Sequence, residues 1–205
     1  MSLSTQVRKN NQNPEKNPIK QKQGYIHIYK GNGKGKTSVL NGMAIRALGY
    51  GFKVKYLRFL KNRESGEILF FQKKTEEMEI ESFYHFSQKF IWDMDKQEDR
   101  EILINKFKEE TRKGFERLKK LLKEDNVDLI IVDEILGCIE NQFISEDELV
   151  EALKNKKAHI EVALSGREPK KGIKNLESIA DLISEISLKK HYFDKGVNAR
   201  RGIEY

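Results

Sequence analysis

A glycine-rich stretch that ends in a lysine and two hydroxyl residues is the clearest chemical signal in the chain. The stretch GNGKGKTS, residues 31–38, follows the apolar run YIHIY and precedes a helical pattern that begins near Thr37. Glycines let backbone N–H groups face a phosphate, and the start of a helix adds positive potential. Lys36 supplies a cation, and Thr37 offers its hydroxyl to Mg²⁺. The stretch therefore predicts a nucleotide-binding loop.

This loop is one residue shorter than the general GxxxxGK pattern, which would need glycine at position 30, where the chain has Lys30. The shorter spacing leads us to expect that the loop holds the phosphate chain differently from an ordinary ATPase. The residues predicted to bind ATP in this stretch are Gly31, Asn32, Gly33, Lys34, Gly35, Lys36, Thr37 and Ser38.

Two carboxylates follow a strongly apolar run further along the chain. In LIIVDE, residues 129–134, four apolar residues precede Asp133 and Glu134. At the carboxyl end of a central strand, such carboxylates reach Mg²⁺ directly or through water. A solvated acidic turn is the alternative interpretation. The buried character of the run favours a magnesium site formed by Thr37, Asp133 and Glu134.

Other reactive side chains give weaker signals. Arg46 lies ten residues after Lys36, and Arg167 follows the apolar run that ends in LSG, so either is a nucleotide contact or a surface charge. Arg167 is favoured because ligands of α/β sheets bind at strand ends. The four histidines lack metal-ligand spacing with one another or with Cys138, so no protein-bound transition metal is predicted.

The elements that must position these residues alternate along the chain. Apolar runs typical of covered parallel strands occur at residues 25–29, 53–60, 78–83, 127–133, 159–165 and 181–187. Helical spacing predicts a crossover helix over residues 97–124. Ser145 and Glu148 form a capping-box pattern that predicts a helix to about Asn155. This order predicts a doubly wound α/β fold with a mainly parallel sheet of about six strands.

Length and composition limit the organisation of the chain. Its 205 residues, 38% of them hydrophobic, suffice for one sizeable core, so we expect a single domain over residues 24–205. Residues 1–23 hold five basic residues and one glutamate and are expected to be a mobile polar arm of charge +4. The remaining residues therefore carry a net charge of only +3, and we predict no nucleic-acid partner. No apolar run could span a membrane, and a lone cysteine suits a cytoplasmic location.

Several motifs together resemble the P-loop ATP:corrinoid adenosyltransferases. They are GNGKGKTS at 31–38, RALGYG at 46–51, Phe90 with Trp92, VDE at 132–134, SGR at 165–167 and KKHYFDKGVNARRGIEY at 189–205. The resemblance runs from about Gly24 to Tyr205 and implies a P-loop NTPase-like (RecA-like) fold of three α/β/α layers. It also implies that the loop holds ATP in the reverse of the usual direction.

The resemblance implies an activity and roles for residues. The 5′-deoxyadenosyl group of ATP would be transferred to the Co(I) of a corrinoid substrate, and triphosphate would be released. Lys36, Thr37 and Glu134 would act on the triphosphate and Mg²⁺. Arg46, Arg167 and Asn32 would contact the nucleotide. A homodimer and a reducing flavoprotein partner are further implications.

Composition and the family resemblance give different predictions for the aromatic stretch around Trp92. Composition alone favours a place in the core for Phe90 and Trp92, because most large aromatics pack there. The resemblance places both against the corrin instead, where they would leave its lower face without an axial ligand.

Two other functions compete with adenosyl transfer. A small-molecule kinase or ATPase would use Asp133 or Glu134 to orient a hydroxyl group or water toward the γ-phosphate. A non-catalytic, nucleotide-gated binding module would use the basic arm to hold an anionic partner. The phosphorus product distinguishes the three functions.

Replacing Trp92 with alanine tests the corrin role. We expect the fold and ATP affinity to persist, while conversion that starts from Co(II) falls much more than conversion from chemically prepared Co(I), because only the first requires loss of the axial ligand. A core role would instead cost about 3–5 kcal/mol of stability and lower both rates. Thermal unfolding and the two rates are measured on the one variant. Equal losses from both cobalt states in a folded variant would contradict the axial-ligand role.

Overall fold

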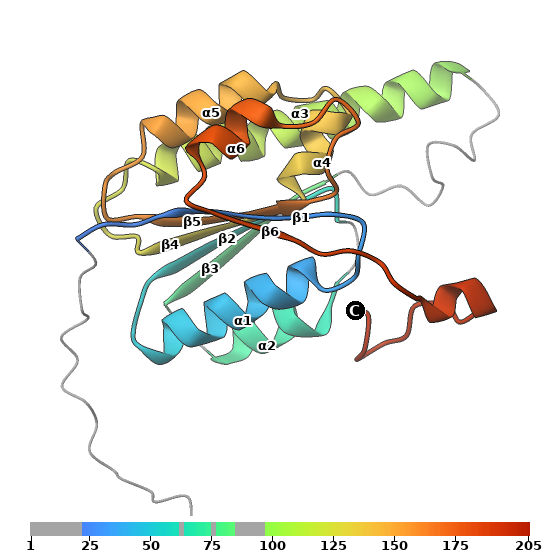
Figure 1. The fold of residues 1–205 in the computed structure, drawn as a ribbon, viewed down its shortest axis with the longest axis horizontal. Coiled ribbons are helices and arrows are strands. Elements are labelled where there is room, and N and C mark those ends of the chain that lie inside the picture. Colours follow the sequence, from blue (N-terminus) through green and yellow to red (C-terminus); the bar gives the residue numbers. More distant parts are fainter. Residues whose placement is uncertain (1–21, 62–63, 75–76, 85–96) are drawn as a thin grey trace, which may run out of the picture.

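The computed structural model describes residues 22–61, 64–74, 77–84 and 97–205, and Figure 1 shows their fold. These residues form a six-stranded sheet in the order β3-β2-β4-β5-β1-β6. Every pairing between its neighbouring strands is parallel. The strands are β1 (Ile26–Lys30), β2 (Val54–Phe59), β3 (Met78–Phe83), β4 (Leu129–Asp133), β5 (Glu161–Gly166) and β6 (Leu182–Glu185). The predicted parallel sheet of about six strands is confirmed.

Helices cover both faces of the sheet, which gives three layers (Figure 1). One face carries α1 (Lys36–Gly49) and α2 (Gly66–Lys74). The opposite face carries α3 (Gln97–Leu121), α4 (Ile135–Glu140), α5 (Glu146–Lys154) and α6 (Lys174–Ile179). A short 3₁₀ helix, η2 (Tyr192–Lys195), follows the last strand. Among the helices that the structure describes, none has the length and apolar character to cross a bilayer.

Strand β4 explains why the sheet needs helices on both faces. All five of its residues are buried. Leu129 and Ile131 belong to the apolar cluster under α1 and α2, whereas Ile130 and Val132 belong to the cluster under α3, α4 and α5. Successive side chains of a strand point to opposite faces, so a continuous apolar run is stable only between two helical layers.

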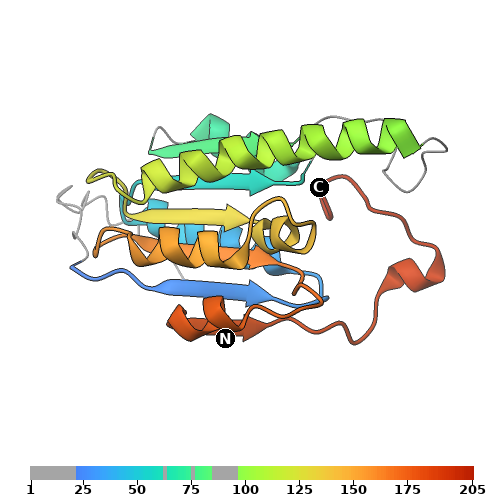
Figure 2. The ribbon, with the colours of Figure 1, turned by 90° about the horizontal axis from the view of Figure 1, so that it is seen from above.

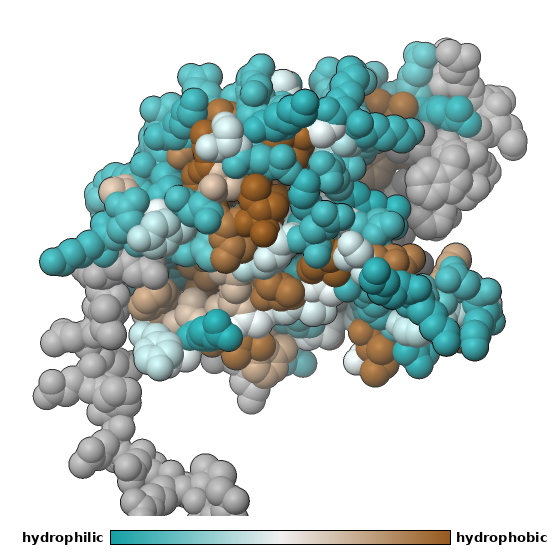
Figure 3. Space-filling model, viewed as in Figure 1, coloured by the Kyte–Doolittle hydropathy of each residue, from teal (hydrophilic) through white to brown (hydrophobic). Residues whose placement is uncertain are grey.

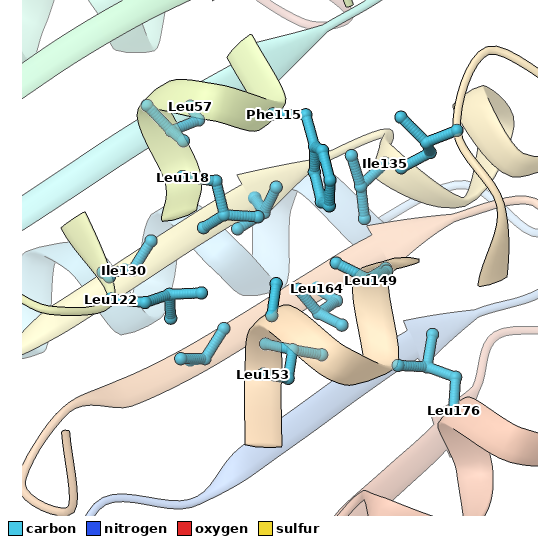
Figure 4. Close-up of a cluster of buried hydrophobic side chains, with 14 of the residues drawn as sticks. Leu57, Phe115, Leu118, Leu122, Ile130, Ile135, Leu149, Leu153, Leu164 and Leu176 are labelled. Carbon is cyan, nitrogen blue, oxygen red and sulfur yellow. The ribbon is translucent and has the colours of Figure 1, made fainter. Parts of the chain in front are cut away.

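The larger core cluster lies between the sheet and the helices of the second face. Figure 4 shows side chains of α3 and α5 packed toward those of the sheet. In α3, Phe115, Leu118 and Leu121 are almost completely buried, as is Leu122 directly after the helix, so the predicted crossover helix packs an apolar face on the sheet. Helix α3 itself ends at Leu121, three residues before the predicted end.

The capping-box prediction is also confirmed. The Ser145 hydroxyl accepts a hydrogen bond from the Glu148 amide, and the Glu148 carboxylate accepts one from the Ser145 amide. Helices α2, α4 and α6 were not predicted. Each has six to nine residues, which is too few turns for a helical period to stand out in the sequence.

All strands deliver their carboxyl ends to one edge of the sheet. Figure 2 shows the arrows pointing the same way, with the chain after β6 passing beyond their tips. Figure 3 shows that the face bearing β6 and α1 exposes hydrophobic residues, whereas polar residues cover the layer of α5 and α6. Leu182 and Ile183 of the edge strand β6 and Ile45 of α1 are among the exposed apolar side chains. In doubly wound folds, ligands bind at the carboxyl edge.

Truncating Leu118 tests the role of α3 in this core. Leu118→Ala should lower the free energy of unfolding by about 2–5 kcal/mol, because Leu118 is fully buried and its removal leaves a cavity. Ile102→Ala is a matched control in the same helix, where the side chain is 51% exposed, and should change stability by less than about 0.5 kcal/mol. Urea denaturation of both variants measures the difference. Equal effects would show that α3 does not anchor the core.

Candidate functional site

A cavity of about 700 Å³ opens at the carboxyl edge of the sheet, a size in the usual range for small-molecule sites. One side is formed by the glycine-rich loop (residues 31–38) and the first turns of α1. Another is formed by the chain that follows β6, which we call the C-terminal segment (residues 186–205). The lining residues are Asn32, Gly33, Lys34, Gly35, Lys36, Thr37, Ser38, Asn41, Gly66, Glu67, Glu134, Arg167, Leu188, His191, Phe193, Asp194, Gly202, Ile203, Glu204 and Tyr205.

The glycine-rich loop turns sharply into helix α1. Gly35 precedes the helix at a φ of 119°, a conformation that favours glycine. Gly35 makes no side-chain cap, and the first turn of α1 contains no acidic residue. The first N–H groups and the positive end of the helix dipole therefore remain available to an anion.

Lys36 lies folded against its own loop. Its ammonium group donates to the carbonyl oxygens of Gly31 at 2.8 Å and Gly33 at 2.9 Å, and the residue is only 7% exposed. Burial lowers the pKa of Lys36, because the charged ammonium loses water, and the nearby Glu134 carboxylate opposes that shift. The loop thus holds a buried cation beside the first turn of α1.

The buried side chain of Asp133 lies next to this loop. Its carboxylate is completely buried at the end of β4 and accepts hydrogen bonds from Ser165 at 2.6 Å and Thr37 at 3.3 Å. The ammonium group of Lys61 lies 2.5 Å from the same carboxylate and 2.6 Å from the Thr37 hydroxyl. Tyr56, which is also buried, contacts the carboxylate at 3.5 Å. The buried charge is therefore paired and hydrogen-bonded, as a stable buried ion requires.

Glu134 faces the cavity from the next position. Its backbone has a φ of 64°, which is unusual for a residue with a side chain, and its amide donates to the Ser165 hydroxyl at 3.1 Å. This turn directs the Glu134 side chain away from the strand. Burial raises the pKa of Glu134, with the neighbouring Asp133 charge as a further cause.

Hard oxygen donors thus gather next to the loop, in Thr37, Asp133 and Glu134. The Lys61 ammonium group is bound to the first two, so a metal ion at Thr37 and Asp133 would take the place of this ammonium group. The oxygen donors suit Mg²⁺, which in nucleotide sites takes one or two carboxylates together with phosphate oxygens and water. Within the described ranges, no cluster of three or more His, Cys, Asp or Glu side chains could hold a metal ion. The donors fit an ion that is shared with a phosphate chain rather than one caged by protein alone.

The structure brings most of the predicted residues to this cavity. Gly31 and the buried Asp133 adjoin its lining residues but are not part of the lining. Arg167 lines the cavity, as the position after β5 predicted. Arg46 does not line it and lies exposed in the last turn of α1, roughly 15 Å along the helix from Lys36. Its contact with the nucleotide stays a prediction. Phe90 and Trp92 lie outside the described residues.

Sequence reasoning missed Lys61 and the wall formed by the C-terminal segment. Lys61 comes two residues after β2, at the same edge as Asp133, and its position after an apolar run is the signal that would have found it. Ser165 was noted only as part of the SGR motif. The motif at residues 189–205 was noted only for the resemblance to the family, and its place beside the loop has no local signal because the contacts join residues more than 150 positions apart.

Comparison with known proteins gives one consistent result. Residues 22–205 match the family described as ATP:corrinoid adenosyltransferase BtuR/CobO/CobP. The chain is 32% identical to the corrinoid adenosyltransferase of Pseudomonas aeruginosa over 183 residues, which covers 89% of this chain and 84% of that protein. It is 30% identical to the corrinoid adenosyltransferase of Escherichia coli K12, with 89% and 86% covered.

Two further likenesses complete the comparison. The corrinoid adenosyltransferase CobA of Salmonella typhimurium is 28% identical over 186 residues, which cover 90% of this chain and 87% of that protein. Among solved structures, the flagellar accessory protein FlaH of Methanocaldococcus jannaschii matches with a TM-score of 0.49 at 15% identity, covering 80% of this chain and 71% of that one.

Removing the Lys36 ammonium group tests the assignment of the loop. Lys36→Ala should weaken ATP binding by about 2 kcal/mol, or roughly 30-fold, because one charged donor to the phosphates is lost. Lys174→Ala, which removes an exposed lysine at the start of α6, is the control and should leave affinity unchanged. Titration calorimetry with ATP and Mg²⁺ measures both. Parental affinity in Lys36→Ala would show that the loop does not hold the nucleotide.

Proposed function

Since the chain belongs to the ATP:corrinoid adenosyltransferase family BtuR/CobO/CobP, we propose that it transfers the 5′-deoxyadenosyl group of ATP to the Co(I) of a corrinoid. The match over residues 22–205 carries this proposal, because the loop and carboxylates alone would serve a kinase or ATPase equally well. The relatives named corrinoid adenosyltransferase, at about 30% identity over most of the chain, support the same activity.

The reaction breaks the bond between ribose C5′ and the oxygen of the α-phosphate. The electron pair of Co(I) forms the new bond to C5′, and the pair of the broken bond leaves with inorganic triphosphate. The substitution transfers no proton, so it requires no general base. Its demands on the protein are in-line positioning of two substrates and stabilisation of charge on the leaving triphosphate.

The residues of the cavity suit that charge stabilisation. Lys36 and the N–H groups at the start of α1 face the space where a triphosphate would lie against the loop, and Arg167 adds a second cation at the cavity wall. Lys36 is held within the loop by the carbonyls of Gly31 and Gly33, so its ammonium group lies at the loop before a phosphate binds. The electrostatics are therefore organised before the substrate binds.

Thr37, Asp133 and Glu134 would hold Mg²⁺, which when bound would neutralise part of the triphosphate charge. Asp133 is already hydrogen-bonded to Ser165, and this contact fixes the orientation of the carboxylate. Glu134, on its strained turn, is the more accessible of the two carboxylates. These roles are specific to a substrate that carries a polyphosphate.

Further parts of the proposal concern the corrinoid and the assembly. Phe90 and Trp92 would contact the corrin, and residues 1–23 would be an arm outside the catalytic domain of residues 24–205. A homodimer in the cytoplasm, with a flavoprotein that reduces the corrinoid, is the assembly that we propose. The resemblance of the sequence to the family supports the corrin contacts, the homodimer and the flavoprotein, whereas composition supports the arm and the cytoplasmic location.

The phosphorus product tests the reaction. With ATP, Mg²⁺ and chemically reduced cobalamin under anaerobic conditions, we expect one triphosphate for each cobalamin that gains a carbon–cobalt bond. Phosphorus NMR measures the first and visible absorption the second. Lys36→Ala is the control and should slow both signals together. ADP with orthophosphate would contradict the proposal in favour of a kinase or ATPase, and absence of turnover would favour a binding module.

A further inference from the structure

The C-terminal segment forms a wall of the cavity opposite the glycine-rich loop. After β6 the chain crosses beyond the carboxyl ends of the strands, forms η2 and returns toward those strand ends (Figures 1 and 2). Its lining residues include His191, Phe193, Ile203 and Glu204. Phe193 and Ile203 are each 65% exposed, so this wall presents apolar surface whereas the loop presents N–H groups and lysine.

The start of this segment is bonded directly to the loop. The Gly33 amide donates to the Ile186 carbonyl at 2.7 Å, and the Leu188 amide donates to the Asn32 side chain at 3.0 Å. A Cβ atom at Gly33 would lie 2.6 Å from the Ile186 carbonyl oxygen. This position must therefore be glycine for the loop and the C-terminal segment to lie this close together. The segment and the loop therefore form one unit at this point.

A cluster of four side chains joins the loop to the end of the same segment. The Lys34 ammonium group donates to Glu204 at 2.7 Å and to the Tyr192 hydroxyl at 2.5 Å, and it lies 5.1 Å from the centre of the Tyr192 ring. The Arg200 guanidinium group donates to the Glu204 carboxylate at 3.3 Å and lies 5.0 Å from the centre of the same Tyr192 ring. Tyr192 also donates to Glu204. We call Lys34, Tyr192, Arg200 and Glu204 the latch.

Glu204 is the centre of the latch. Its carboxylate accepts from all three partners, and its side chain is only 11% exposed, although that of Lys34 is 42% exposed. Arg200, followed by Lys34 and Tyr192, holds the pKa of Glu204 below its usual range, so the carboxylate stays ionised even in mildly acidic solution. Arg200 and Tyr192 belong to the C-terminal segment and orient the Glu204 carboxylate within it, whereas Lys34 links the segment to the loop through both Glu204 and Tyr192.

The position of Lys34 makes this arrangement informative. Lys34 lies inside the glycine-rich loop, between two glycines, where a lysine side chain could reach a phosphate. Its ammonium group is instead bound to the C-terminal segment. The contact draws Ile203, which precedes Glu204, to the cavity wall. The latch therefore serves the apolar side of the cavity rather than the phosphate side.

We propose that Glu204 and Tyr192 are positioning residues that, through Lys34, hold the C-terminal segment as the wall against which the nucleoside part of ATP lies. The loop then binds the triphosphate, and the wall, with Phe193 and Ile203, packs against the adenosine. This inference rests on the proposed function only for the identity of the nucleotide.

The test compares ATP with inorganic triphosphate, each titrated with Mg²⁺ in the absence of corrinoid so that no adenosyl transfer occurs. In Glu204→Gln, ATP should bind about fivefold or more weakly, as expected for loss of a network of several charged contacts. Triphosphate should bind no more weakly than to the parent, because Lys34 is released and the loop is intact. Glu204→Asp, which keeps the charge, should recover part of the ATP affinity.

Controls separate the latch from a general effect on charge or folding. Glu185→Gln makes the same charge change at the exposed end of β6 and should leave ATP affinity unchanged. In the Lys34→Met background, Glu204→Gln should have no further effect, because Glu204 acts through Lys34. Unchanged or tighter ATP binding in Glu204→Gln, or equal weakening of ATP and triphosphate, would overturn the proposal. Since none of these titrations requires turnover, failure of the proposed reaction would be seen separately in the product assay.

Discussion

The buried carboxylate of Asp133 is the constraint on which the rest of the site depends. A fully buried charge is stable only when it is paired and hydrogen-bonded, and the partners of Asp133 come from three different places in the chain. Thr37 belongs to α1, Lys61 follows β2, and Ser165 is the penultimate residue of β5. Satisfying this one group therefore fixes the carboxyl ends of two neighbouring strands and the start of α1 relative to β4. The geometry of the loop follows from the same contacts, because Thr37 is its seventh residue.

The order of the strands makes this arrangement possible. Strand β4 lies between β2 and β5, and β1 follows β5, so the loop after β1 can reach across to Asp133 through the first turn of α1. Because all strands are parallel, every one of these side chains arrives at the same edge of the sheet. Helices on both faces exclude water from β4 along its whole length. Its last residue, Asp133, is therefore buried, and its carboxylate needs partners of opposite charge or hydrogen-bond donors.

Local patterns in the sequence were sufficient for the strands, for α1, α3 and α5, and for the loop and its two carboxylates. Each of these is encoded within a short window: an apolar run, a helical period, a capping box or a glycine spacing. Lys61 and the C-terminal segment could not be found in this way. Lys61 resembles any lysine after a strand until Asp133 is placed beside it, and Glu204 is 170 positions from Lys34. Arg46 shows that closeness in the sequence can also mislead. It is only ten residues from Lys36, but the rise of the α1 helix places it far from Lys36 in space.

A reaction without proton transfer makes the non-local contacts more important than any single reactive group. An enzyme that relies on a general base concentrates its chemistry in a few atoms, whereas a substitution at C5′ depends on how two large substrates are held. The loop can orient only the triphosphate, because its donors are N–H groups and ammonium ions. The C-terminal segment, from the opposite end of the chain, would supply the apolar wall for the other half of the nucleotide. The hydrogen bonds from Gly33 to Ile186 and from Leu188 to Asn32, together with the latch, tie the two halves together. Small shifts of the C-terminal segment should therefore alter the direction in which C5′ faces the corrinoid while leaving the phosphate contacts in place.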